Sequence, residues 1–152
     1  MARYEMSLRT SKTPDEAFAF MADLTNFASW DPGVISSVQV VGDAAELGSA
    51  YDVEVKSIGG TMILTYEITE FDTPNRFVAT AMSDKLTSVD VITVVPDEVG
   101  DGEGSVVTYD AELTLNGAFA IGEPALALAF NSIGDKAAAG LVRALQGVRV
   151  GG

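Results

Sequence analysis

The four tyrosines of this chain are its clearest candidates for contact with a bound molecule. Each lies in a stretch where apolar and charged residues alternate, and they are Tyr4, Tyr51, Tyr66 and Tyr109. Because successive side chains of a strand point to opposite faces, this pattern predicts that all four rings point to the apolar face of a sheet. A tyrosine joins an apolar ring to a hydroxyl, so such a face suits an apolar guest that hydrogen bonds orient. Rings that only fill a core would give the same alternation.

Asp90 is the carboxylate that could add acid–base chemistry to this face. Two sets of alternate residues in this strand are equally apolar: one contains Asp90, Ile92 and Val94, and the other consists of residues 89, 91, 93 and 95. The pattern therefore does not decide whether Asp90 points toward the core or toward solvent. An inward Asp90 would have a raised pKa because of burial, and it would be a candidate general base. We favour a solvated Asp90, because carboxylates are seldom buried without a partner. The catalytic candidates are Tyr66, Tyr109 and an inward Asp90.

Other kinds of reactive site are excluded or disfavoured by the composition. Histidine and cysteine are both absent, which excludes Ser-His-Asp and Cys-His sites and argues against zinc. The acidic loop at residues 97–104 lacks the ligand spacing of an EF-hand. Its glycines lead into a strand rather than a helix amino terminus, which argues against a nucleotide site. We therefore expect no metal and no other cofactor.

The length and net charge of the chain limit the number of domains and the classes of binding partner. The 152 residues, 47% of them hydrophobic, suit a single domain that spans residues 1–152. A net charge of -13 repels phosphate backbones and anionic membranes, so nucleic acid is not expected as a partner. Arg3 lies where a signal peptide would have its apolar run, and no stretch reaches the ~20 apolar residues of a membrane span. We expect a cytoplasmic protein without stable membrane insertion, and the sequence leaves its oligomeric state open.

Alternation and turn residues predict seven strands with short connections between them. Short connections require antiparallel neighbours, because parallel strands need a crossover of about a dozen residues or more. After the first strand, a capping box at residues 13–16 opens a short helix, and residues 26–31 form a second short turn of helix. Gly59-Gly60 marks a hairpin, and residues 72–75 mark a turn. The predicted strands are 3–10, 35–41, 48–57, 61–71, 76–82, 88–95 and 105–115.

One long helix, opened by Pro124 and closed near Gly147, follows the last strand. Its apolar residues recur at the steps of three and four that a buried helix face requires. They are Leu126, Phe130, Ile133, Ala137, Leu141 and Leu145. Small residues, including Gly134 and Gly140, keep this stripe shallow. They either leave a cavity of about 300 to 1,000 Å³ between helix and sheet or permit close packing with no void.

Several motifs, in this order of elements, resemble the helix-grip fold of the START and Bet v 1-like superfamily. The motifs are residues 13–23, 30–34, 66–77, 108–113 and 133–141. The chain is most similar to the SRPBCC proteins described as polyketide cyclase/dehydrase and lipid transport. This resemblance implies an α+β fold in which a curved seven-stranded antiparallel sheet wraps around a long C-terminal helix, with two short helices after strand 1. It also implies a cavity, but it does not identify the guest, since this scaffold carries transporters, receptors and enzymes.

We expect the protein to bind or carry a small or medium-sized hydrophobic molecule, such as a lipid, a polyketide or an aromatic compound. Arg3, Arg9 and Lys56 all lie on the outward parity of their strands, which leaves the interior without a cation and disfavours catalysis on a polyketide. A cyclase or dehydratase-like enzyme stays open as an alternative, and an inward carboxylate beside a tyrosine would favour it. A partner-binding regulatory domain with a vestigial, filled cavity is the other alternative.

The predicted ligand contacts come from the inward strand faces, the long helix and the cavity mouth. Trp30, next to the helix break at Pro32, either packs in the core or forms a wall of the mouth. Asp31 is expected to turn the chain, and residues 58–60 and 116–122 are the expected access route. The predicted contacts are Trp30, Tyr51, Val53, Leu64, Tyr66, Tyr109, Leu113, Phe119, Phe130, Ile133 and Ala137.

Overall fold

Eight strands form one antiparallel sheet in the computed structural model, which describes residues 1–57, 59–99 and 102–150. The strand order is β2-β3-β4-β5-β6-β7-β1-β8, so the strands from β2 to β7 form a meander and β1 closes it beside β7. The strands are β1 (Ala2–Thr10), β2 (Val34–Val41), β3 (Ala50–Ser57), β4 (Gly60–Asp72), β5 (Arg76–Met82), β6 (Leu86–Pro96), β7 (Ser105–Leu115) and β8 (Val148–Val150).

Three short helical segments connect β1 to β2. The first, α1 (Pro14–Ala22), begins with the predicted capping box, in which Thr13 accepts from the Glu16 N–H and Glu16 accepts from the Thr13 N–H. Asp23 ends α1 and caps the 3-10 helix η1 (Leu24–Asn26). The four-residue α2 (Phe27–Trp30) follows and ends before Pro32. These successive helical segments place the Phe27 and Trp30 rings over the inner face of the sheet.

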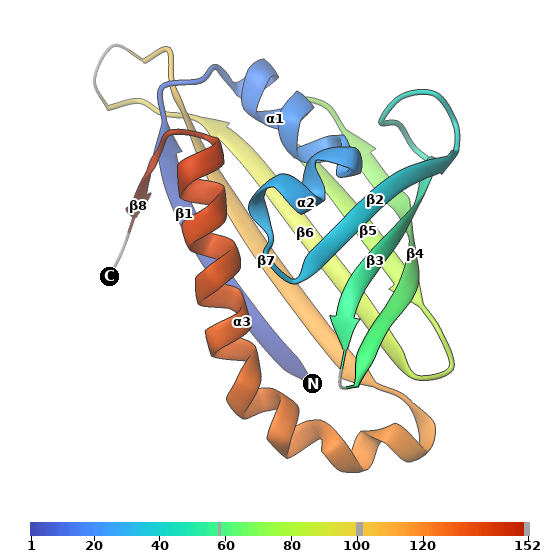
Figure 1. Cartoon of the computed structure of the whole chain (residues 1–152). Helices are drawn as coiled ribbons and strands as arrows, with labels where there is room; N and C mark the ends of the chain where they lie inside the picture. The colour runs from blue at the N-terminus through green and yellow to red at the C-terminus, as the bar shows by residue number, and fades with distance from the viewer. Residues whose placement is uncertain (58, 100–101, 151–152) are drawn as a thin grey trace.

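The long helix α3 (Glu123–Ala144) lies across the same face of the sheet (Figure 1). It follows the 3-10 helix η2 (Gly117–Gly122), which curves past the end of β7. Its later turns contact β1 and α2. A Cβ atom at Gly140 would lie 1.8 Å from the Trp30 carbonyl oxygen, so only glycine lets the two helices approach this closely.

The hydrophobic core lies between the inner face of the sheet and the helices. Burial alternates residue by residue along β1 and β6, as a strand with one face in the core requires. Phe18 of α1 packs edge-on against Phe71 and Phe77, with ring centroids 5.4 and 5.6 Å apart. All four tyrosines are buried, which confirms the orientation that the alternation predicts.

The predicted α+β arrangement of a curved antiparallel sheet around a C-terminal helix is confirmed, but the strand count of seven is wrong. The eighth strand, β8, pairs with residues 7–9 of β1 after α3 ends. Gly147 makes this possible, because a Cβ atom there would lie 2.5 Å from the Arg9 carbonyl oxygen. A strand of three residues is too short to give a readable alternation. Gly59, with a φ of 79°, belongs to the predicted hairpin between β3 and β4, whereas Ile58 lies outside the described residues.

Candidate functional site

Small side chains line the middle of the sheet's inner face. Asp90 of β6 stands between Ala79 of β5 and Ala111 of β7, because the strand registers pair it with both. In the next row, Ser88 stands opposite Ala81. Alanine and serine side chains are short, so this part of the face is shallow, and larger side chains around it form its walls.

Asp90 is buried in this shallow region, with 4% of its surface exposed. Among the described residues, no group donates a hydrogen bond to its carboxylate. Burial, together with the negative charges of Asp31 and Asp110, raises its pKa from 3.8 to about 8. At neutral pH most Asp90 side chains are therefore protonated and can donate a hydrogen bond.

The preference for a solvated Asp90 is therefore wrong. The strand begins two residues earlier than predicted, which extends one of the two possible inward sets. That set is Leu86, Ser88, Asp90, Ile92 and Val94, and all five are buried. Leucine at the start and valine at the end fix the parity of the whole strand, and Asp90 follows with it.

Two tyrosine hydroxyls lie near Asp90. The Tyr66 hydroxyl is 2.7 Å from the Ser88 hydroxyl, and either can be the donor. The Tyr109 hydroxyl has no hydrogen-bond partner among the described residues, and 7% of the residue is exposed. Burial, and next the charge of Asp90, raise the pKa of both tyrosines above the usual value of 10. Both are therefore neutral donors across the physiological range. We call Tyr66, Ser88, Asp90 and Tyr109 the inner cluster.

Aromatic rings from α2 cover the inner cluster. Phe27 stacks on Trp30 with ring centroids 4.8 Å apart. Trp30 meets Tyr109 edge-on at 5.3 Å, and Phe27 meets Tyr66 edge-on at 5.9 Å. Trp30 is thus buried in the core, and it also forms a wall of the inner cluster.

Two acidic residues, Asp31 and Asp110, place negative charge near the inner cluster. Asp31 accepts a hydrogen bond of 2.8 Å from the Gly33 N–H, which fixes the turn after α2 as the sequence predicts. Burial raises the pKa of Asp31, while this hydrogen bond and the charge of Lys56 lower it. None of the nine Lys and Arg residues is buried. Arg3 pairs with Asp110 on the outer face at 2.7 Å, and Arg9 pairs with Asp97 at 3.3 Å.

Half-buried apolar side chains lie beyond the inner cluster, toward the tip of the β3–β4 hairpin and the end of β7. They pack against the core without being enclosed by it, and they are Val55, Met62, Leu113, Leu115 and Phe130. We call this set the open end. In the sheet register, Leu113 stands opposite Ser88, so the open end begins where the inner cluster stops.

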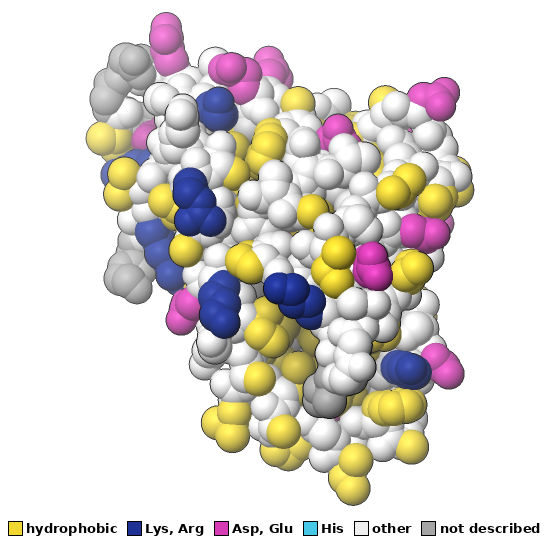
Figure 2. All heavy atoms as spheres, viewed as in Figure 1, with side chains coloured by type: hydrophobic (Ala, Val, Ile, Leu, Met, Phe, Trp, Pro, Cys, Tyr) yellow, Lys and Arg dark blue, Asp and Glu magenta, His cyan; other side chains and the backbone are white. Residues whose placement is uncertain are grey.

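The segment that faces the open end exposes much of its own apolar surface. In η2 and the first half of α3, Ile121 is 91% exposed and Leu128 is 84% exposed, and Phe119 and Ile133 are also exposed. Figure 2 shows hydrophobic side chains gathered around a hollow between α3 and the ends of β3 and β4. This hollow lies on the side of the open end.

The structure places the predicted contact residues in different surroundings. Trp30, Tyr66 and Tyr109 meet at the inner cluster, while Leu113 and Phe130 belong to the open end. A second group, Tyr51, Val53 and Leu64, is buried on the same face. Phe119 and Ile133 are exposed, and Ala137 is buried against the core. Their roles as ligand contacts stay predictions.

The closed half of α3, residues 134–144, leaves no space where the sequence suggested it. A Cβ atom at Gly134 would lie 2.2 Å from the Tyr4 ring, so this ring lies flat against the helix. The Tyr4 hydroxyl donates to Asp135 at 2.6 Å and accepts from Arg149 at 2.8 Å, at the edge of the sheet. Of the two alternatives for the small residues, close packing is therefore found at Gly134, and Tyr4 does not share an environment with Tyr66 and Tyr109.

Sequence reasoning missed Ser88 and Phe27. Ser88 shares the inward parity of Asp90, so a correct parity for β6 would have found it. Phe27 lies in a four-residue helix that is too short for a helical period to show. The alanines opposite Asp90 and Ser88 could not be found either, because only strand pairing brings them there.

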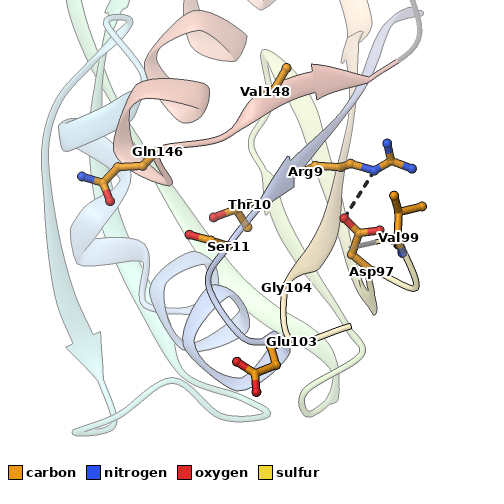
Figure 3. Close-up of a pocket in the computed structure, with 9 residues that line it drawn as sticks. All are labelled: Arg9, Thr10, Ser11, Asp97, Val99, Glu103, Gly104, Gln146 and Val148. Carbon is orange, nitrogen blue, oxygen red and sulfur yellow. Dashed lines mark hydrogen bonds and ion pairs between the residues drawn. The ribbon is translucent and has the colours of Figure 1, made fainter. Parts of the chain in front are cut away.

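Two other hollows lie outside the inner face. One, of about 330 Å³, lies beside β8 and is lined by mixed polar residues that include Arg9, Thr10 and Asp97 (Figure 3). The other, of about 510 Å³, lies between α1 and the β2–β3 connection, with Phe18 and Phe71 in its lining. In Figure 3 the Arg9 and Asp97 side chains point toward each other and pair, so they do not converge on a shared guest position. The inner cluster with the open end is the better candidate site.

Comparison with known families gives a match over nearly the whole chain. The family model described as polyketide cyclase / dehydrase and lipid transport matches residues 1–146. No curated protein matches the sequence. No helix among the described residues is long and apolar enough to cross a membrane.

Solved structures with the same fold share little sequence with this chain. A START superfamily protein from Mycobacterium smegmatis aligns with a TM-score of 0.74 at 9% identity, covering 96% of this chain and 98% of that one. A protein from Thermus thermophilus aligns with a TM-score of 0.70 at 17% identity, covering 95% and 94%. A protein from Deinococcus radiodurans aligns with a TM-score of 0.67 at 15% identity, covering 95% of each. These likenesses establish the helix-grip fold.

Proposed function

The chain belongs to the polyketide cyclase / dehydrase and lipid transport family, and on that premise we propose that it binds or carries a small or medium-sized hydrophobic molecule between its sheet and its C-terminal helix. The open end admits the guest, and the inner cluster receives its polar group. One observation carries this proposal: half-buried apolar side chains lie beside Asp90 and Tyr109, whose polar groups have no hydrogen-bond partner among the described residues.

The physical argument rests on the cost of unpaired polar groups. A buried group without a hydrogen bond costs about 1 to 3 kcal/mol, so native proteins rarely retain one without a use. Asp90 and Tyr109 are 4% and 7% exposed, and their side-chain oxygens have no hydrogen-bond partner among the described residues. A guest that accepts hydrogen bonds from them would recover this free energy. Its apolar body would at the same time cover Leu113 and Phe130.

The first test asks whether the protein retains a guest from its host cell. Native mass spectrometry of protein purified without added ligand should show a bound mass that organic solvent extracts. Leu113→Trp places a large ring in the open end and should reduce the bound fraction severalfold. Thr114→Trp, on the outer face of the same strand, is the matched control and should leave that fraction unchanged. Equal bound fractions in both variants would argue against a guest at the open end.

Access to the site is expected through η2. Hydrogen exchange with and without a bound hydrophobic ligand should show protection in residues 117–122 and in the first turns of α3, where apolar side chains are exposed. The other predicted access segment includes Ile58, which lies outside the described residues. Unchanged exchange across 117–130 would contradict access through this segment.

A cyclase or dehydratase-like activity is the second candidate function, and the inward Asp90 favours it. A protonated carboxyl beside a neutral tyrosine could donate to a carbonyl oxygen that gains negative charge during enolisation. If so, Asp90→Asn should slow turnover of a poly-β-keto substrate by about a hundredfold or more, with little change in binding. Glu112→Gln, on the outer face next to Ala111, is the control. No turnover by the parent protein would leave the carrier function as the proposal.

A further inference from the structure

We infer that the inner cluster selects guests that present a neutral oxygen acceptor, such as the carbonyl of a ketone or ester, and that it refuses a carboxylate or phosphate at the same position. This inference rests on the proposed binding function and adds the chemical class of the guest. It follows from which hydrogen bonds the cluster can make and from the charges around it.

The hydrogen-bond donors of the inner cluster are all neutral O–H groups while Asp90 is protonated. Tyr66 and Ser88 share one hydrogen bond, which leaves one of their two protons free for a guest. No described residue accepts the Tyr109 proton, or the Asp90 proton while that carboxyl is protonated. Neutral donors on one shallow patch suit the lone pairs of a carbonyl oxygen. An aliphatic or aromatic guest without oxygen would leave these donors unpaired, which costs affinity.

The charges around the inner cluster disfavour an anionic guest. Asp31 and Asp110 act on Asp90 with negative charge, and no Lys or Arg among the described residues is buried near it. Lys56 is the cation that acts nearby, and its effect is on Asp31 at the turn after α2. From the other sides Asp90 faces Tyr66 of β4 and Tyr109 of β7, both neutral. Burying a charge without a partner costs several kcal/mol, so a carboxylate guest would bind far more weakly here.

The rim of the hollow has positively charged side chains, unlike the inner cluster. Figure 2 shows Lys and Arg side chains on the surface beside the hollow, where a long amphiphile could place an acidic head group without reaching the inner cluster. A test of the inner cluster therefore needs compact, rigid probes, whose oxygen reaches it only when the ring system enters the open end.

Three probes of nearly equal shape separate the possibilities: 2-ethylnaphthalene, 2-acetylnaphthalene and 2-naphthoate. Isothermal titration at pH 6.5 should give the ketone about tenfold tighter binding than the hydrocarbon, the value of one to two hydrogen bonds. The naphthoate should bind at least tenfold more weakly than the ketone. Naphthoate binding as tight as that of the ketone would overturn the inference.

The pH dependence and two variants assign the effect to Asp90. As pH rises from 6.5 to 9.5, Asp90 loses its proton, so the ketone should bind the parent about tenfold more weakly. Asp90→Asn keeps an N–H donor and cannot ionise, so its ketone affinity should not change over this range. Glu112→Gln removes a carboxylate from the outer face and should behave like the parent. An equal loss of affinity in Asp90→Asn would overturn the role of Asp90.

The probe series also separates this inference from the function on which it rests. If the hydrocarbon and the ketone bind equally, the protein binds apolar molecules, and selection of an oxygen acceptor is wrong. If none of the three probes binds, and no mass co-purifies with the parent, the binding function falls and the inference falls with it. Circular dichroism of each variant establishes that the affinities compare folded proteins.

Discussion

The two halves of α3 meet the rest of the molecule in opposite ways. The closed half, residues 134–144, presents glycine and alanine to β1 and α2 and lies directly on them, with Gly134 against the Tyr4 ring and Gly140 against the Trp30 backbone. The open half, residues 123–133, contains no buried residue, and Leu128 is 84% exposed. One continuous helix is thus a structural anchor at one end and an uncovered apolar surface at the other.

This difference shows how one helix can combine stability with access. Close contact at the closed half fixes the position of α2, and α2 holds the rings of Phe27 and Trp30 over the inner cluster. Loose contact at the open half leaves Leu113, Leu115 and Phe130 half-buried. The contribution of α3 to the free energy of folding therefore comes mainly from its closed half, and the open half is where the proposed guest would bind.

The largest expected effect is at the closest contact of the closed half. In Gly140→Ala the new methyl group would lie 1.8 Å from the Trp30 carbonyl oxygen, and a backbone atom cannot yield as a flexible side chain can. We expect a loss of about 4 kcal/mol or more in the free energy of unfolding, measured by urea denaturation. Ala127→Leu in the open half is the control and should change it by less than about 0.5 kcal/mol. Similar losses in both variants would contradict the difference between the halves.

The second prediction concerns the effect of Asp90 in the inner cluster on the pH dependence of stability. The pKa of Asp90 is about 8 in the folded protein and 3.8 ordinarily. Between these values a rise in pH removes the proton from the unfolded chain but not from the folded one, so the parent loses stability as pH rises from about 4 to 8. Asp90→Asn lacks this loss and should be about 3 kcal/mol more stable than the parent at pH 6.5, relative to their difference at pH 4. A difference independent of pH, in parallel denaturation series, would show that Asp90 is not desolvated.

A smaller effect distinguishes the two tyrosines of the inner cluster. Tyr66→Phe removes the hydrogen bond to Ser88, which should cost about 1 kcal/mol of stability. Tyr109→Phe removes a hydroxyl with no described partner and should leave stability unchanged or slightly higher. For binding of 2-acetylnaphthalene, Tyr109→Phe should weaken affinity by about tenfold or less. Thermal denaturation and titration of both variants measure these effects, and a marked loss of stability in Tyr109→Phe would indicate a structural partner for its hydroxyl.

The smallest expected effect lies at the exposed apolar surface of η2 and the open half of α3. Ile121 and Leu128 are among the most exposed apolar residues of the chain. Replacing either with serine should change the free energy of unfolding by less than about 0.5 kcal/mol, because little buried contact is lost. Denaturation curves that coincide with that of the parent would support this description. A loss above about 2 kcal/mol would mean that this surface is covered in solution.

Much of the fold could be predicted because its signals are local. The capping box at Thr13 and Glu16 forms as expected, and β5 (Arg76–Met82) and β7 (Ser105–Leu115) have the predicted bounds. The inward direction of the four tyrosines follows from the period of two, which needs no information about partners. The strand β8 could not be predicted, because its three residues form a strand only by pairing with β1.

The candidate site was less predictable, because its members come together through strand pairing and helix contact. Tyr66 and Tyr109 were identified from their own strands, but Ser88, Phe27 and the alanines around Asp90 were not. The small residues of α3 allowed two readings, a cavity or close packing. Close packing is found at Gly134, because the ring of Tyr4, 130 positions earlier in the chain, lies against it.

The sequence by itself determined the alternation of the strands, the start of α1, the length of α3 and the absence of histidine and cysteine chemistry. Each of these depends on residue type and on neighbours a few positions away, which the chain carries within itself. The tertiary structure alone decided that Asp90 is buried with no hydrogen-bond partner in the described part of the chain, and that Tyr66 and Tyr109 share its surroundings while Tyr4 does not. It also decided that α3 is closed at one end and open at the other. These outcomes depend on contacts between residues far apart in the chain, and burial and desolvation exist only once those contacts form.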